Sequence, residues 1–152
     1  MPVKIRLQRK GTKKRPFYHI VVADSRSPRD GKFIEKLGNY NPLTVPATID
    51  LDINKAYEWI SKGAQPTDTA HAILKYKGVM YKKHLQRGVS KGALTQEKAD
   101  EMLATWLAGK AQHIEKRIDE VKAKQEELRA RIFGTPKARK SAAAPAAEAE
   151  AS

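Results

Sequence analysis

The stretch Gly11-Thr-Lys-Lys-Arg-Pro-Phe-Tyr-His-Ile-Val-Val-Ala23 joins three consecutive cations to an apolar run that follows them directly. Residues 17–23 are rich in aromatic and β-branched side chains, which is typical of a strand, and Pro16 is tolerated at the first position of such a strand. The cations Lys13 to Arg15 therefore belong to a turn at the end of a buried strand. A turn of this kind presents positive charge on a rigid support, which suits the binding of a dense negative surface.

A second strand is predicted just before this stretch. Over residues 3–8 apolar side chains alternate with Lys, Arg and Gln, which is the period of two expected for a half-buried strand with one polar face. Residues 11–15 then connect the two strands as an antiparallel hairpin with a basic tip. Further strands are predicted over residues 32–40 and 48–51.

Two helices are predicted after these strands. Asp52 is a suitable N-cap for a helix over residues 53–62, with Gly63 just past its end. A second helix is expected to start at Pro66 and Thr67 and to stop at Gly78. Strands that are followed by helices, rather than alternating with them, favour the α+β class. We expect a small, mainly antiparallel or mixed sheet of about four strands with two packed helices.

The rest of the chain divides into three segments. Residues 81–94 are basic and interrupted by glycine, so we expect a connector. Residues 95–133 predict a long helix with a heptad seam, some 55–60 Å in length at about 1.5 Å per residue. Three interpretations of this helix stay open: contact with a neighbouring protein, contact with RNA, or a solvated charged helix. The composition of residues 134–152 predicts a disordered tail, and residues 1–80 form the compact core.

The charge and the cysteine content of the chain limit the kinds of molecule that it can bind and the chemistry that it can carry out. The chain has 152 residues, a formal net charge of +13, a sequence pI of about 10.0 and no cysteine. Residues 1–40 hold 11 Lys and Arg against 3 acids, whereas residues 93–152 hold 11 against 10. This balance favours a polyanion, either nucleic acid or an acidic membrane surface. Disulfides and thiol chemistry are excluded. No apolar run approaches the roughly 20 residues of a membrane span and no secretory signal is seen, so we expect a soluble, intracellular protein.

Eight cations of the first third are the candidate phosphate contacts. Five belong to the hairpin. Two belong to a loop that turn-forming residues predict over residues 24–31, and one begins the strand predicted over residues 32–40. Tyr18 and Tyr40 are either stacking residues for an unpaired base or packed sheet residues. The eight candidates are Arg6, Arg9, Lys13, Lys14, Arg15, Arg26, Arg29 and Lys32.

Enzyme motifs are not found. There is no Walker-type phosphate loop and no His-Glu-x-x-His. His19, Asp24 and Ser25 do not predict a triad, because Asp24 and Ser25 begin a polar turn where capping is their ordinary role. The remaining histidines are scattered and predict no metal site: His71, His84 and His113. Two alternatives stay open: a metal-dependent nuclease that uses Asp24, Asp30 and Glu35, and a general DNA-binding protein.

Three motifs together resemble the bacterial small-subunit ribosomal protein S16 family. They are Val-Lys-Ile-Arg-Leu-Gln-Arg-Lys-Gly at 3–11, Lys-Lys-Arg-Pro-Phe-Tyr-His-Ile-Val-Val-Ala-Asp-Ser-Arg at 13–26, and Arg-Asp-Gly-Lys-Phe-Ile-Glu-Lys-Leu-Gly-Asn-Tyr-Asn-Pro at 29–42. Residues 52–68 extend the match, which covers about residues 1–80. The chain departs from the usual pattern at Gln8, Thr12 and His19, which affects individual contacts.

This resemblance implies a fold and a role. The fold would be a small mixed sheet with packed helices. The role would be to bind folded small-subunit ribosomal RNA near its 5′ region and to support its assembly, beside neighbouring ribosomal proteins on the cytoplasmic ribosome. The resemblance implies no catalysis, no cofactor or metal, no small-molecule substrate and no membrane. Folded RNA is recognised largely by shape and charge, which agrees with the basic hairpin.

Overall fold

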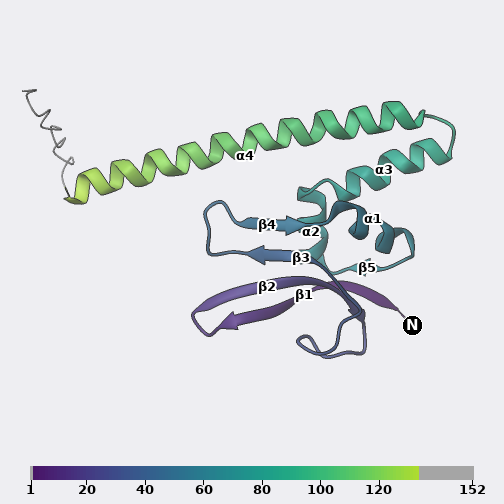
Figure 1. Cartoon of the computed structure of the whole chain (residues 1–152), viewed down its shortest axis with the longest axis horizontal. Coiled ribbons are helices and arrows are strands. Elements are labelled where there is room, and N and C mark those ends of the chain that lie inside the picture. The colour runs from purple at the N-terminus through teal and green to yellow at the C-terminus, as the bar shows by residue number, and fades with distance from the viewer. Residues whose placement is uncertain (1, 134–152) are drawn as a thin grey trace, which may run out of the picture.

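The computed structural model describes residues 2–133 and has the expected α+β architecture (Figure 1). The predicted disordered tail, residues 134–152, lies outside the described residues. In chain order the elements are β1 (Val3–Thr12), β2 (Arg15–Asp24), β3 (Glu35–Asn41), β4 (Thr48–Leu51), α1 (Ile53–Ser61), β5 (Gln65–Pro66), α2 (Asp68–Tyr76), α3 (Val79–Ser90) and α4 (Gln96–Phe133).

The five strands form one mixed sheet in the order β4-β3-β2-β1-β5. The pairs β1–β2, β2–β3 and β3–β4 are antiparallel, whereas β5 runs parallel to β1. The sequence predicted only four strands, because β5 is two residues long and shows no alternation. It is held by pairing of Gln65 and Pro66 with Lys4 and Ile5. Proline is compatible with this place because β5 is an edge strand.

The β1–β2 hairpin is tighter than expected. Thr12 pairs with Arg15, so only Lys13 and Lys14 form the turn, and Arg15 already belongs to β2. Gly11 has a φ of +82°, and a Cβ there would collide with the backbone carbonyl oxygen of Arg15. A side chain at position 11 would therefore strain this end of the hairpin.

The core lies between one face of the sheet and the helices α1 and α2. Ile5, Ile20 and Val22 alternate onto that face, and they are fully buried against Ile60 and Leu74 of the helices. Helix α1 starts where the sequence predicts, because Asp52 Oδ1 accepts hydrogen bonds from the backbone N–H groups of Asn54 and Lys55 at 3.0 and 3.1 Å. The alternation of β1 and β2 thus fixes which face carries the helices.

The predicted connector is wrong over most of its length, because residues 79–90 form helix α3. Val79 and Leu85 are buried, which gives this segment an apolar side. Gly88 suggested an interruption of regular structure, but it lies inside α3, where the side chain of Leu94 packs against it. A Cβ on it would lie 3.0 Å from Cδ1 of Leu94, so the glycine leaves room for the chain to turn back after the helix.

The long helix α4 is observed close to its predicted bounds. Its 38 residues correspond to about 57 Å at 1.5 Å per residue. Its first part packs on α3, where the Tyr81 and Trp106 rings lie 5.7 Å apart, and Figure 1 shows that it then runs along the molecule beyond the sheet. Among the apolar heptad positions of α4, Ile114 and Ile118 are half-buried and Ile132 is exposed.

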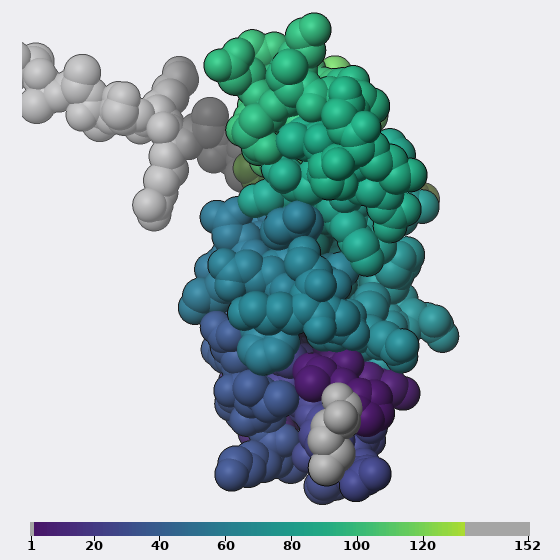
Figure 2. Space-filling model, turned by 90° about the vertical axis from the view of Figure 1, so that its right-hand side faces the viewer, coloured from purple at the N-terminus to yellow at the C-terminus, as the bar shows by residue number. Residues whose placement is uncertain are grey.

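The end-on view shows the layers. The start of β1 lies at the bottom, α1 in the middle and the α3–α4 turn at the top (Figure 2). Within residues 2–133 no helix has the length and apolar character needed to cross a membrane.

The core assignment predicts that Leu74→Ala lowers the free energy of unfolding by about 2–5 kcal/mol, because it leaves a cavity beneath β1 and β2. Urea unfolding followed by near-UV circular dichroism measures the change. The control is Ile132→Ala, since Ile132 is 63% exposed and should shift the free energy by no more than about 0.5 kcal/mol. Equal effects of the two substitutions would contradict the assignment.

Candidate nucleic-acid interface

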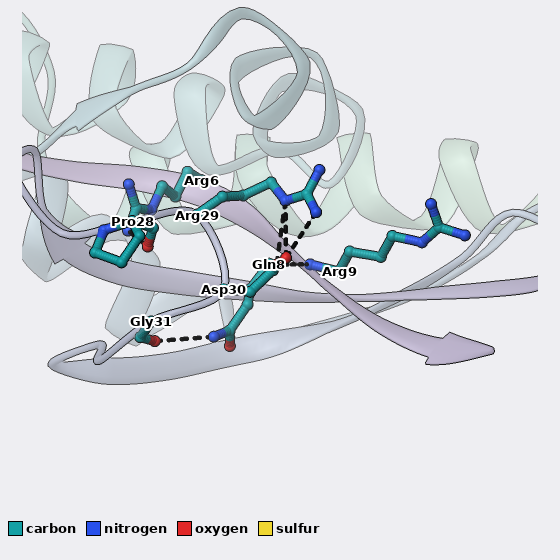
Figure 3. Close-up of polar contacts among 7 residues, drawn as sticks. All are labelled: Arg6, Gln8, Arg9, Pro28, Arg29, Asp30 and Gly31. Atoms are coloured by element: carbon teal, nitrogen blue, oxygen red, sulfur yellow. Dashed lines mark hydrogen bonds and ion pairs between the residues drawn. The ribbon is translucent and has the colours of Figure 1, made fainter. Parts of the chain in front are cut away.

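The segment between β2 and β3 folds back across the face of β1 that points away from the helices. The side chain of Arg6 reaches this segment and lies beside Pro28 in Figure 3. Nη1 donates to the carbonyl oxygen of Ser27 at 2.8 Å and Nη2 donates to that of Pro28 at 2.7 Å. Because a guanidinium is a rigid fork of donors, these two bonds fix the direction of the segment as well as its distance.

Two further contacts hold the same segment. Gln8, only 1% exposed, donates from Nε2 to the carbonyl oxygen of Gly31 at 3.0 Å. The backbone N–H of Arg9 donates to Asp30 Oδ1 at 2.9 Å. We name residues 25–34 the clamped loop, because successive residues of β1 hold it.

The clamped loop buries part of the outer sheet face. Val21 and Ala23 point away from the helices, yet they are 1% and 0% exposed. The loop rejoins the sheet where the Ile34 N–H donates to the Val22 carbonyl oxygen at 2.7 Å. It is therefore an ordered part of the fold.

An ion pair inside the loop links two candidate residues. Arg29 Nη2 lies 2.6 Å from Asp30 Oδ2, and both side chains are exposed. The hydrogen bond from Arg29 holds the pKa of the Asp30 carboxyl below its usual value, and the backbone N–H of Arg9 acts in the same direction. The charge of Arg29 is thus balanced in part by its neighbour.

The eight candidate cations fall into three groups. Lys13, Lys14 and Arg15 lie exposed at the hairpin tip, and Arg26, Arg29 and Lys32 lie exposed on the clamped loop. Arg6 and Arg9 lie between them and are half-buried. Arg6 positions the loop through its carbonyls, and Arg9 Nη2 donates to the Lys13 carbonyl oxygen at 3.3 Å.

The clamped loop starts at the end of β2 that is far from the tip and runs back along β1 toward it. The loop meets β1 at Arg9, three residues before Thr12 and hence about 10 Å from the tip at some 3.3 Å per residue. In Figure 1 the hairpin and the loop occupy the side of the molecule opposite α4. One side therefore carries all six exposed candidates.

Of the two interpretations of the tyrosines, the structure supports packing in the sheet. Tyr18 and Tyr40 are cross-strand partners whose ring centroids lie 6.0 Å apart, and Tyr40 packs against the core. Both are on the helix side of the sheet, because Tyr18 shares its face with Ile20. They are not on the outer face.

The sequence interpretation missed four residues on the outer face, namely Lys10, Phe17, His19 and Lys36. Phe17 and His19 lie there with ring centroids 5.9 Å apart, and Lys10 pairs directly across from Phe17. Partial burial and then the charges of Lys36 and Lys10 lower the pKa of His19. The spacing of two residues between Phe17 and His19 was the signal for a shared face.

The acids of the nuclease alternative have other partners. Asp24 Oδ1 accepts from the Arg26 N–H at 2.9 Å, and Glu35 Oε2 accepts from Trp59 Nε1 at 2.7 Å. No three metal-ligating side chains of the His, Cys, Asp or Glu type gather anywhere within residues 2–133. His19 is five strand residues, about 16 Å, from Asp24, so these two residues do not form a triad with Ser25.

Comparisons with known proteins decide the family. A family model described as "Ribosomal protein S16" matches residues 9–67. "Small ribosomal subunit protein bS16" of Flavobacterium psychrophilum is 53% identical over 133 residues, which cover 88% of this chain and 74% of that protein. The chain belongs to the ribosomal protein S16 family. Members of this family are structural and not enzymes, so the chain is a structural protein of the small ribosomal subunit.

Sequence similarity to at least one relative extends over the residues of the long helix. The protein of the same name from Flavobacterium johnsoniae is 51% identical over 154 residues, which cover 99% of this chain and 82% of the relative. That of Porphyromonas gingivalis is 60% identical over 110 residues, 72% of this chain and 57% of the relative. The match to the F. johnsoniae protein thus extends through α3 and α4, well past the residues of the family model.

The clamp predicts that Arg6→Lys loosens the loop, because one ammonium cannot reproduce the two-armed contact. The amide hydrogens of Gly31 and Ile34 should exchange about tenfold faster or more, since hydrogen bonds from charged groups contribute about 1.5–3 kcal/mol. Hydrogen exchange followed by NMR measures this. Lys4→Arg, on the same face of β1, is the control and should leave the rates unchanged. Unchanged rates in Arg6→Lys would rule out the clamp.

The ion pair predicts that Arg29→Gln raises the pKa of Asp30 toward its ordinary value, because Arg29 is the main cause of the lowered pKa. NMR titration of the carboxyl group measures this shift. Since the folded-state pKa is depressed, the contribution of Asp30 to stability is present above the ordinary carboxyl pKa and is lost as the pH falls through the lowered value. An Asp30 pKa that does not respond to Arg29→Gln would show that the pair does not form in solution.

Proposed function

We propose that the chain binds folded small-subunit ribosomal RNA in its 5′ region and supports the assembly of that region on the cytoplasmic ribosome. The observation that carries this proposal is the clamped loop. It fixes Arg26, Arg29 and Lys32 on the same side of an ordered sheet as the hairpin cations. Folded RNA presents closely spaced phosphates and 2′-hydroxyls, and preordered cations bind such a surface with little further loss of conformational freedom.

Residues 1–80 are the proposed RNA-binding unit. Their excess of positive charge lies largely within residues 1–40. Helix α4 contains 8 Lys and Arg and 8 acids, so it adds no net attraction for a polyanion. We assign α4 to contact with neighbouring ribosomal proteins, because its exposed seam residues Leu128 and Ile132 are apolar. The proposal needs no cofactor, metal, membrane or small-molecule substrate.

The proposed interface predicts that Lys14→Glu combined with Arg15→Glu weakens binding to a 5′-domain fragment of small-subunit ribosomal RNA. Two lost phosphate contacts should reduce the slope of log affinity against log salt by about two. The melting temperature should change little, because both side chains are exposed. Filter binding at several salt concentrations and a thermal melt provide the two measurements.

The matched control is Lys122→Glu combined with Lys124→Glu. It makes the same change of charge at two exposed positions of α4 and should leave the affinity and the slope near their original values. Equal losses in both double variants would show that only net charge matters. Duplex DNA bound as tightly as the folded RNA would support the general DNA-binding alternative instead.

A further inference from the structure

The outer face of the sheet is left uncovered beside the hairpin tip. The helices α1 and α2 cover the opposite face, and the clamped loop covers Val21 and Ala23. Phe17 and His19, further toward the tip on the same face, are half-exposed. Two aromatic rings therefore stay accessible on a rigid central strand, between the two groups of exposed cations.

The two rings form a platform with a defined geometry. Their centroids lie 5.9 Å apart and their planes are inclined by 85°. Lys10 is the cross-strand partner of Phe17 on β1, and Asn39 is the partner of His19 on β3. Aromatic side chains on a sheet surface stack unpaired bases of single-stranded segments, and flanking cations contact the adjoining phosphates.

The charges around the platform favour a nucleotide over other ligands. Lys10, Arg15 and Lys36 share this outer face, and they are exposed. Asp50, the partner of Asn39 on β4, is the acid on the far edge of the face. Partial burial, and then the charges of Lys36 and Lys10, lower the pKa of His19. A neutral imidazole suits stacking and leaves the phosphate contacts to the lysines.

One acceptor beside the platform lacks a donor. Asn39 Oδ1 is buried and receives no hydrogen bond from any other residue between positions 2 and 133. The amide belongs to the residue paired with His19, so it lies next to the ring. Because this oxygen is buried, the Asn39 side chain would have to turn outward before it could accept a hydrogen bond from a base amino group or a ribose 2′-hydroxyl.

We propose that an unpaired base of the bound RNA stacks on one of the two rings, Phe17 or His19, and meets the edge of the other, with Lys10 and Lys36 on the adjoining phosphates. This inference rests on the proposed function and adds a specific contact to it. The hairpin tip and the clamped loop would hold the folded part of the RNA. The platform between them would select a place where a base is free to leave its helix.

The first experiment compares Phe17→Leu combined with His19→Leu against the unchanged protein, using the 5′-domain RNA fragment. Removal of stacking should weaken binding about 5- to 150-fold, with an unchanged salt slope because no cation is lost. Dimethyl sulfate probing of the complex should show an unpaired base that is protected by the unchanged protein and reactive with the variant. Tyr76→Leu is the control, because it removes another exposed aromatic ring, at the end of α2.

A second variant separates stacking from folding. Phe17→Tyr combined with His19→Tyr retains both rings, so its affinity should stay within a few-fold of the original value. Ultraviolet cross-linking of the unchanged protein, which needs no substitution, should attach RNA at Phe17 or His19. Cross-links confined to other residues, or a leucine variant with full affinity and the original reactivity pattern, would overturn the inference.

The outcomes also distinguish this inference from the function on which it rests. Loss of binding in Lys14→Glu/Arg15→Glu together with full binding in the leucine variant would retain RNA binding and reject the platform. Full binding in both would reject both. A leucine variant whose salt slope falls along with its affinity would also count against stacking, because phosphate contacts would then have been lost.

Discussion

The antiparallel pairing of β1 with β2 is the constraint on which the other features depend. Ile5 lies opposite Val22 and Leu7 opposite Ile20, which gathers the apolar side chains on the helix side. The same register turns Arg6 and Gln8 to the other side, where they meet the clamped loop. A shift of one residue would exchange the two faces. It would bury a guanidinium against the helices and leave the loop without its donors.

The clamped loop shows how a small protein can position charge without a second apolar core. Phe33 and Ile34 within the loop are 38% and 57% exposed, so apolar burial of its own side chains does not hold it. Instead β1 supplies side-chain and backbone donors to carbonyl and carboxylate oxygens at intervals along the strand. Fixed polar contacts of this kind set the spacing of the loop cations before any partner arrives, which reduces the ordering cost of binding.

Local patterns predicted much of this structure, and long-range contacts account for what they missed. The alternation in β1, the cap at Asp52 and the length of α4 follow from neighbouring residues, and each was predicted. Strand β5 depends on pairing with a strand some sixty residues earlier. Helix α3 buries Val79 in the core shared with the sheet and the helices α1 and α2, a contact that its local sequence does not indicate. In the site, the basic residues were recognised by type. That Arg6 positions the loop, and that Phe17 and His19 share the outer face, became clear only from the folded sheet.

The contact between α4 and the turn that joins α2 to α3 has a mechanical consequence. The indole ring of Trp106 lies over Gly78, so close that a Cβ there would clash with it, and Gly78 itself has a φ of +86°. From Trp106 to Phe133 the helix extends about 40 Å, with its last turns exposed. A tilt of about 5° at this contact would move the far end by about 3–4 Å over that length. The close packing of Trp106 on Gly78 therefore helps to fix the direction of α4, whose far end lies well beyond the sheet.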